Sequence, residues 1–80
     1  MYKINVANSA AIGGSKIFEN VTVGEVIADE EFAPYLTTGS MSMNGILLTA
    51  ADYGKTLSEM GLSKDRPNYL VAIKNANGAF

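Results

Sequence analysis

The chain of 80 residues contains neither cysteine nor histidine, and this limits its fold and its chemistry more than any other feature. Without cysteine, it has no disulfide and no thiolate zinc site to support a small fold. Because 80 residues lie near the lower size limit for an unaided core, hydrophobic packing must supply the stability. Hydrophobic residues make up 48% of the chain, so we expect residues 1–80 to form a single domain around one core.

The same absences exclude much catalytic chemistry. Histidine is the commonest general base and the commonest metal ligand. Serines are plentiful, but no histidine is present to activate one. Asp29, Glu30 and Glu31 are adjacent in sequence rather than spaced as a general acid and base. We therefore expect a protein that is not an enzyme and that binds no metal or cofactor.

Charge and hydropathy limit the classes of partner that the chain is expected to bind. The formal net charge is −2, so there is no basic surface of the kind that binds nucleic acid. No run of 18 apolar residues exists, which argues against a membrane-spanning helix. The first residues lack the basic start and continuous apolar segment of a signal peptide. We expect a soluble, cytoplasmic protein that binds neither nucleic acid nor membrane.

The first half of the sequence predicts a hairpin followed by a helix. Residues 2–7 alternate apolar and polar side chains, as in a half-buried strand, and residues 15–19 form a second strand. Thr22 and Glu25 have the spacing of a capping box, which marks the start of a helix. Pro34 ends this helix by about residue 33, because proline has no N–H group and restricts the residue before it.

The second half predicts three more strands. Asn44-Gly45 is the strongest short hairpin signal in the chain and favours a type I′ turn between strands 40–43 and 46–48. Thr49 and Asp52 form a weaker capping pair before a short helical turn within residues 53–62. Residues 69–74 are the most strongly β-prone segment and predict the last strand.

This order of elements is that of the β-grasp fold, and one segment strengthens the likeness. GKTLSEMGLSKD followed by YLVAIK resembles the C-terminal third of ubiquitin and its relatives. In that family a glycine, a basic residue and Thr-Leu-Ser precede a helical turn, an aliphatic residue and an aliphatic strand. Those positions are here Gly54 to Ser58, Leu62 and residues 70–73. The resemblance implies an α+β fold, in which one main helix packs on one face of a mixed four- to five-stranded sheet.

The resemblance also implies a small non-enzymatic module that presents a sheet face to partner proteins. Met41 and Met43 on one strand and Val71 on the last strand are candidates for this face. Methionine suits adaptable binding surfaces. The orientation of the last strand is open at this stage. Tyr69, Val71 and Ile73 are bulkier than Leu70 and Ala72, which favours burial of the side chains of the first three. Alignment with the family would bury Leu70 instead.

Two other functions remain as alternatives. A sulfur carrier or conjugated modifier of this fold ends in a free diglycine, but this chain ends in NANGAF and supplies only Gly78, so a protease would have to trim it. The second alternative is a small inhibitor or accessory subunit, encoded by a phage or mobile element, that binds a basic partner surface through its acidic residues. The candidate residues for contact with a basic partner are the acids Glu25, Asp29, Glu30 and Glu31. An unguarded sheet edge could also pair two copies of the chain.

Overall fold

The computed structural model describes residues 1–36 and 40–73, and every structural statement below concerns these two segments. Strands, one α-helix and two short 3₁₀ helices follow one another along the chain. In order they are β1 (Tyr2–Asn8), β2 (Ile12–Phe18), α1 (Val23–Ile27), η1 (Ala33–Tyr35), β3 (Ser40–Met43), β4 (Ile46–Leu47), η2 (Ala50–Asp52) and β5 (Asn68–Ile73).

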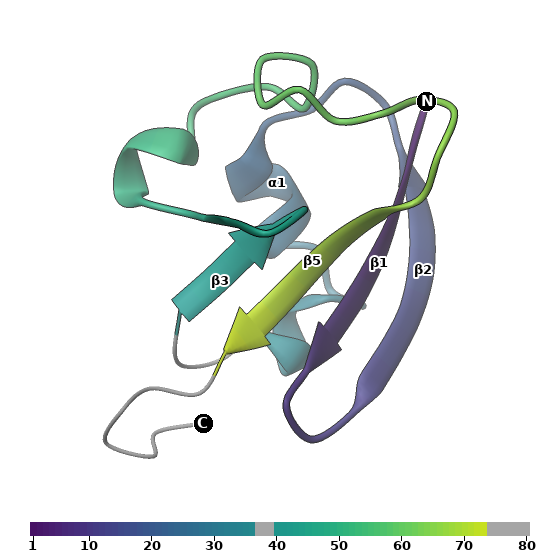
Figure 1. Ribbon diagram of the computed structural model, residues 1–80, viewed down its shortest axis with the longest axis vertical. Helices are drawn as coiled ribbons and strands as arrows, with labels where there is room; N and C mark the ends of the chain where they lie inside the picture. The colour runs from purple at the N-terminus through teal and green to yellow at the C-terminus, as the bar shows by residue number, and fades with distance from the viewer. Residues whose placement is uncertain (37–39, 74–80) are drawn as a thin grey trace.

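The strands form one mixed five-stranded sheet in the order β2-β1-β5-β3-β4. β1 pairs antiparallel with β2 and parallel with β5, while β3 pairs antiparallel with both β5 and β4. The last strand thus lies beside the first at the centre of the sheet. In Figure 1 the sheet faces the reader, and α1 and η1 lie behind it. The molecule is therefore a small α/β domain, consistent with the α+β class, in which no described helix covers the near face of the sheet, called here the open face.

Three local signals in the sequence are confirmed. The side chain of Thr22 accepts the N–H of Glu25, and the Glu25 carboxylate accepts the N–H of Thr22, so the capping box forms. At η2, Asp52 Oδ2 accepts both the N–H and the side-chain hydroxyl of Thr49, at 2.9 and 3.2 Å. Asn44 and Gly45 have φ angles of 53° and 84°, which are the left-handed values that a type I′ turn requires.

The α-helix is shorter than the sequence predicts. It covers Val23–Ile27 instead of continuing to about residue 33. After it, Asp29 Oδ1 accepts the N–H of Glu31 at 2.9 Å, and this local bond competes with the helical pattern. Pro34 instead occupies the start of η1, a position where a missing N–H costs little. The acid-rich segment therefore turns instead of extending the helix.

Other element boundaries also need correction. β2 begins at Ile12 and not at residue 15, because Gly13 and Gly14 belong to the strand. A side chain at Gly13 would meet Val6 at 2.6 Å, and Gly14 has φ of 87°, so both positions require glycine within a bulged strand. Residues 53–62 form turns instead of a short helix. The last strand covers 68–73, and residue 74 of the predicted strand lies outside the described residues.

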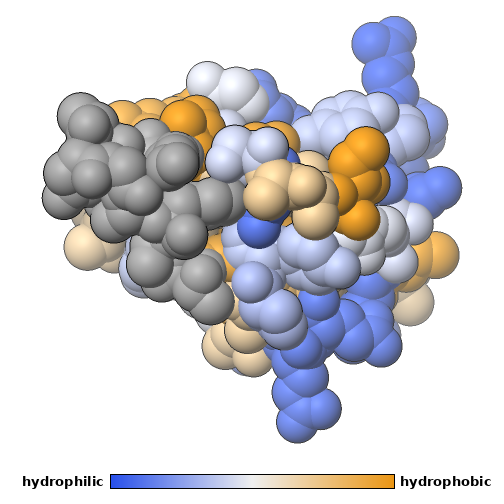
Figure 2. Space-filling view, turned by 90° about the horizontal axis from the view of Figure 1, so that it is seen from below, coloured by the Kyte–Doolittle hydropathy of each residue, from blue (hydrophilic) through white to orange (hydrophobic). Residues whose placement is uncertain are grey.

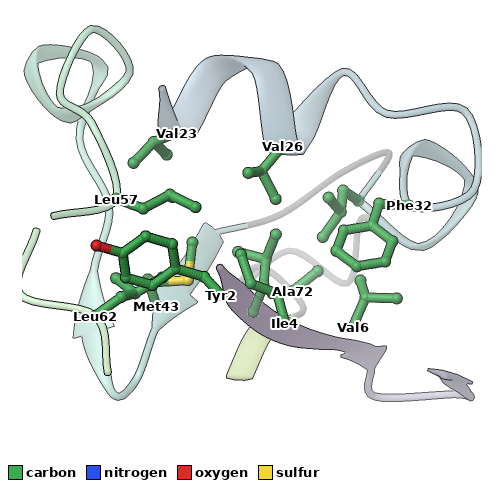
Figure 3. Packing of buried hydrophobic residues seen from close by; sticks show 12 residues of the cluster. Tyr2, Ile4, Val6, Val23, Val26, Phe32, Met43, Leu57, Leu62 and Ala72 are labelled. Atoms are coloured by element: carbon green, nitrogen blue, oxygen red, sulfur yellow. The ribbon is translucent and has the colours of Figure 1, made fainter. Parts of the chain in front are cut away.

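The core lies between the sheet and α1. In Figure 3, Val23 and Val26 point from α1 toward side chains of the sheet and of the segment before β5. Twelve hydrophobic residues are buried here: Tyr2, Ile4, Val6, Val23, Val26, Phe32, Leu36, Met43, Leu57, Leu62, Leu70 and Ala72. Leu57 and Leu62 are both among them, so the segment that resembles ubiquitin contributes to the core, as expected.

The orientation predicted from bulk for the last strand is wrong. Leu70 and Ala72 are buried, whereas Tyr69 and Ile73 are 54% and 48% exposed. The reason lies in the register with β1, where Val6, an inward residue, pairs with Leu70. Register sets which face a residue occupies, and the size of a side chain does not override it.

Candidate functional site

The open face carries a line of side chains that crosses the whole sheet. Ala7 of β1 pairs with Ile12 of β2 on one side and with Val71 of β5 on the other. Ser42 of β3 then pairs with both Val71 and Leu47. Residues paired in register project to the same face, so these five form one line, called here the cross-strand row. Four of its five side chains are apolar.

Exposed apolar side chains extend this row. Tyr69 and Ile73 lie two residues to either side of Val71 on β5 and project to the same face. Ile12 and Leu47 at the ends of the row are 85% and 58% exposed. The cross-strand row together with Tyr69 and Ile73 is called the open-face patch. Large hydrophobic side chains gathered on one exposed face mark a contact surface, whereas single ones are ordinary.

The open face carries little charge. Among the outward positions of the described strands, Lys3 of β1 is the only charged residue. Figure 2 views the molecule from the end that holds the β1–β2 connection. Hydrophobic and weakly polar groups occupy the middle of this view, and strongly hydrophilic groups project at its margins. The low charge of the open face therefore follows from the residues at the outward positions of the described strands.

The structure brings only one of the three predicted apolar candidates onto this face. Val71 lies at the centre of the cross-strand row. Met43 pairs with the inward residue Leu70, is 1% exposed and belongs to the core. The prediction that Met43 lies on an exposed binding face is therefore wrong. Met41 pairs with Ala72, lies on the same inner side and packs against the core while half-buried.

The predicted acidic candidates lie on the helix side of the sheet. The Glu25 carboxylate is occupied by the capping box. Lys16 Nζ lies 2.7 Å from Asp29 Oδ2 and 3.9 Å from Glu31 Oε2. The hydrogen bond from Lys16 holds the pKa of Asp29 below its ordinary value and raises the pKa of Lys16 itself. Glu30 is exposed and also contributes to the raised pKa of Lys16. These contacts fasten β2 to the segment after α1.

A fully buried asparagine lies where the sheet meets the loop before β5. Asn68 Nδ2 donates to the carbonyl oxygens of Lys3 at 3.1 Å, Ser63 at 2.9 Å and Arg66 at 3.4 Å. Its Oδ1 accepts the N–H of Ser63 at 3.0 Å and the side-chain amide of Asn44 at 2.9 Å. The side chain is thus satisfied on both sides, as a buried amide needs to be.

Asn44 completes this polar cluster from the β3–β4 turn. Its backbone N–H donates to the Tyr69 carbonyl at 2.8 Å, and its Oδ1 accepts the Tyr69 N–H at 2.8 Å. The side chain therefore extends the pairing of β3 with β5 by one further step. The side chains of Asn44 and Asn68 are called the asparagine hub, and they join β1, β5, the β3–β4 turn and the loop at residues 63–66.

The described residues offer no enclosed site. Within residues 1–36 and 40–73, no pocket is found, and no three acidic side chains come together as metal ligands would. None of the helices in this part of the chain is long and apolar enough to span a bilayer. The features with functional potential are the open-face patch and the asparagine hub.

Reasoning from the sequence missed most of the open-face patch. Ile12 lies between the two predicted strands of the first hairpin, and bulk favours Tyr69 and Ile73 as buried residues, whereas alignment with the family favours Leu70. The alternation in residues 2–7 identifies the inward side of β1, which is correct. In the parallel pair of β1 and β5, the inward residue Val6 lies beside Leu70, so Tyr69 and Ile73 project to the opposite face. The necessary signal was therefore present in β1, but using it requires the strand register.

Comparison with known proteins gives no family. No protein-family model matches the chain, and no curated protein or solved structure matches it either. A functional assignment therefore depends on the geometry of the residues described above.

Proposed function

We propose that this protein is a small non-enzymatic, ubiquitin-like module that binds a partner protein through the open-face patch. The observation that carries the proposal is the cross-strand row, to which all five strands contribute and in which only Ser42 is polar. Protein interfaces have an apolar centre depleted of charge and a polar rim, and the open face has this composition. A sheet face also holds its side chains rigidly, which lowers the entropic cost of binding.

Several features support the β-grasp assignment within this proposal. The last strand lies parallel to the first at the centre of a mixed sheet, and one short helix packs on one face. Leu57, in the segment that resembles ubiquitin, is fully buried. Leu57 N–H donates to the Val21 carbonyl at 2.9 Å, so this segment is tied to the residues just before the helix. The segment thus has a defined place in the core.

We infer the chemistry of the partner from the charge of the open face. Lys3 supplies a single positive charge beside an apolar patch, while the acidic cluster lies on the other side of the sheet. The matching surface presents aliphatic or aromatic side chains at its centre and an acidic group opposite Lys3. We place this interaction in the cytoplasm, in agreement with the absence of cysteine from the sequence.

Two neighbouring residues of β4 provide a matched test. Leu47 and Ile46 are both 58% exposed, but only Leu47 projects to the open face, whereas Ile46 pairs with the buried Met43. Full-length Leu47→Ser and Ile46→Ser proteins are compared with the parent protein as baits, with proteins captured from the native cell quantified by mass spectrometry. The affinity of each selectively captured partner is then measured with purified proteins.

We expect Leu47→Ser to weaken the partner by about tenfold, as for an interface residue worth more than 1 kcal/mol, while Ile46→Ser leaves the affinity unchanged. Equal losses in both variants, with both still folded, would contradict binding through the open face. Sedimentation of the purified chain tests whether a second copy occupies the face instead. Residues 75–80, on which a carrier role depends, lie outside the described residues.

A further inference from the structure

The asparagine hub contains a chemically labile residue. Asn44 precedes Gly45, and glycine offers the least steric hindrance of any residue to attack by its backbone nitrogen on the preceding side chain. We propose that Asn44 is a site of spontaneous deamidation that the native hydrogen bonds keep unreactive, and that its conversion dismantles the asparagine hub. The proposal does not depend on whether the open-face patch binds a partner.

The reaction requires only water. The Gly45 nitrogen forms a bond to Asn44 Cγ, the bond from Cγ to Nδ2 breaks, and ammonia leaves with the proton from the Gly45 nitrogen. The cyclic imide that results is opened by water at one of its two carbonyl carbons. Opening at one carbon gives aspartate at position 44, and opening at the other gives isoaspartate, in which the backbone passes through the former side chain. Asn44 is exposed, so water has access to the imide.

The native structure opposes the first step. The Asn44 amide is held at both ends, because Oδ1 accepts the Tyr69 N–H at 2.8 Å and Nδ2 donates to Asn68 Oδ1 at 2.9 Å. These bonds hold the side chain across the sheet against β5. Attack by Gly45 requires the amide to leave both partners and rotate toward its own backbone. The reaction therefore proceeds only from molecules in which the β3–β4 turn has opened locally.

Conversion replaces a donor with an acceptor at a place where a donor is needed. Ser63 N–H can only donate, and the Lys3 and Ser63 carbonyls can only accept, so these groups fix the orientation of the Asn68 amide. Asn68 Oδ1 must then face position 44. A carboxylate at this position brings two acceptors together in place of the present 2.9 Å hydrogen bond. Rotating the Asn68 amide by half a turn would place its oxygen against the carbonyl oxygens of Lys3 and Ser63, which are also acceptors.

Isoaspartate acts through the backbone as well. The turn consists of Asn44 and Gly45, between the paired residues Met43 and Ile46. An additional backbone carbon in a two-residue turn changes the spacing of the strands that it joins. The aspartate product therefore loses the hydrogen bond to Asn68, and the isoaspartate product changes the geometry of the turn as well.

The chain contains a second Asn-Gly pair, Asn77-Gly78, which serves as a chemical reference. The full-length protein is incubated at mildly alkaline pH with and without a denaturing concentration of urea. Deamidation at each asparagine is followed by peptide mass spectrometry, which detects the exchange of ammonia for water. In urea we expect the two sites to react at similar rates. In the native protein we expect Asn44 to react at least about tenfold more slowly than it does in urea.

Two variants separate protection by the hub from simple unfolding. Asn68→Ala removes the partner of Asn44 Nδ2, whereas Leu57→Ala destabilises the core without touching the hub. Both are compared under conditions in which circular dichroism shows each to be folded. We expect faster deamidation of Asn44 in Asn68→Ala than in Leu57→Ala at equal global stability. A third variant, Asn44→Asp, reproduces one product and should have a lower urea midpoint than the parent at neutral pH.

Several outcomes would overturn the proposal. Equal rates for Asn44 in native and unfolded protein would show that the fold gives no protection. Equal acceleration in Asn68→Ala and Leu57→Ala would attribute the protection to global stability instead of the hub. An Asn44→Asp protein as stable as the parent would show that conversion leaves the hub intact.

Discussion

The asparagine hub makes a strong prediction about a substitution that hardly changes side-chain volume. Asn68→Asp retains the shape of the side chain but replaces the Nδ2 donor with a carboxylate oxygen. This oxygen then faces the carbonyls of Lys3 and Ser63, at the 3.1 and 2.9 Å now spanned by hydrogen bonds. Asn68 is 0% exposed, so water does not relieve the conflict. The variant therefore tests hydrogen bonding without forming a cavity.

The magnitude follows from the cost of burying a charge. A fully buried carboxyl group can have its pKa raised by about 3–5 units. Ser63 N–H and Asn44 Nδ2 still donate to the other oxygen, which reduces this to roughly 2 units, or about 3 kcal/mol at 1.36 kcal/mol per unit. The lost donors add about 1 kcal/mol. A total of about 4 kcal/mol is comparable with the whole stability of an 80-residue domain, which is about 4–12 kcal/mol.

The loss must depend on pH in a defined direction. A raised pKa in the folded state means that protonation favours folding. The penalty is therefore small below the unfolded pKa of about 3.9, grows as the pH rises, and is complete above the folded pKa. At pH 3 we expect Asn68→Asp to cost about 1–2 kcal/mol, because a protonated carboxyl still supplies one donor. Near pH 7 the full loss of about 4 kcal/mol should appear.

Urea denaturation at several pH values checks this prediction. The chain has four tyrosines and no tryptophan, so unfolding is followed by circular dichroism and tyrosine fluorescence. Stability is compared at each pH with that of the parent protein, which cancels the effect of the other carboxyl groups. Asn68→Ala is the control, because its loss of donors and volume carries no charge and should cost the same at each pH. A cost for Asn68→Asp that stays constant within about 0.5 kcal/mol between pH 3 and 7 would refute the reasoning.

Three further predictions concern the core, a helix cap and an ion pair. Leu57→Ala should lower the free energy of unfolding by about 2–5 kcal/mol through lost burial and a cavity, and a change below about 0.5 kcal/mol in urea would place Leu57 outside the core. Thr22→Ala should cost about 1 kcal/mol by removing the cap of α1, and Thr22→Ser should recover most of it. Asp29, whose pKa is lowered by Lys16, contributes stability that is lost as the pH falls through its folded pKa. Lys16→Met should therefore reduce the loss of stability on acidification below about pH 4, and an unchanged acid profile would contradict the role of this pair.

Much of the fold could be predicted from short-range signals. The capping box at Thr22 and the turn at Asn44-Gly45 are specified by neighbouring residues and form as predicted. The end of the helix was not predictable in the same way. Asp29 bonds locally to Glu31 and stops the helix well before Pro34, and the sequence pattern gives both possibilities similar weight.

The glycines of β2 show a second limit. Gly13 and Gly14 read as a loop, because glycine is common in turns and weakens strands. Their actual role depends on Val6 and Tyr35, which leave no space for a side chain at Gly13. Contacts between residues far apart in the sequence thus decide whether a glycine pair marks a turn or a bulged strand.

The orientation of the last strand links the two candidate functional features. Asn68 begins β5 and pairs with Ile4, and both residues are fully buried. Once Asn68 points inward to satisfy its carbonyl partners, alternation places Leu70 and Ala72 in the core and turns Tyr69, Val71 and Ile73 outward. A slip of one residue would bury these larger side chains but would expose the side chain of Asn68. In this strand, the hydrogen bonds of Asn68 therefore favour one orientation, and the burial of the larger hydrophobic side chains favours the other. The open-face patch exists because the polar requirement is met.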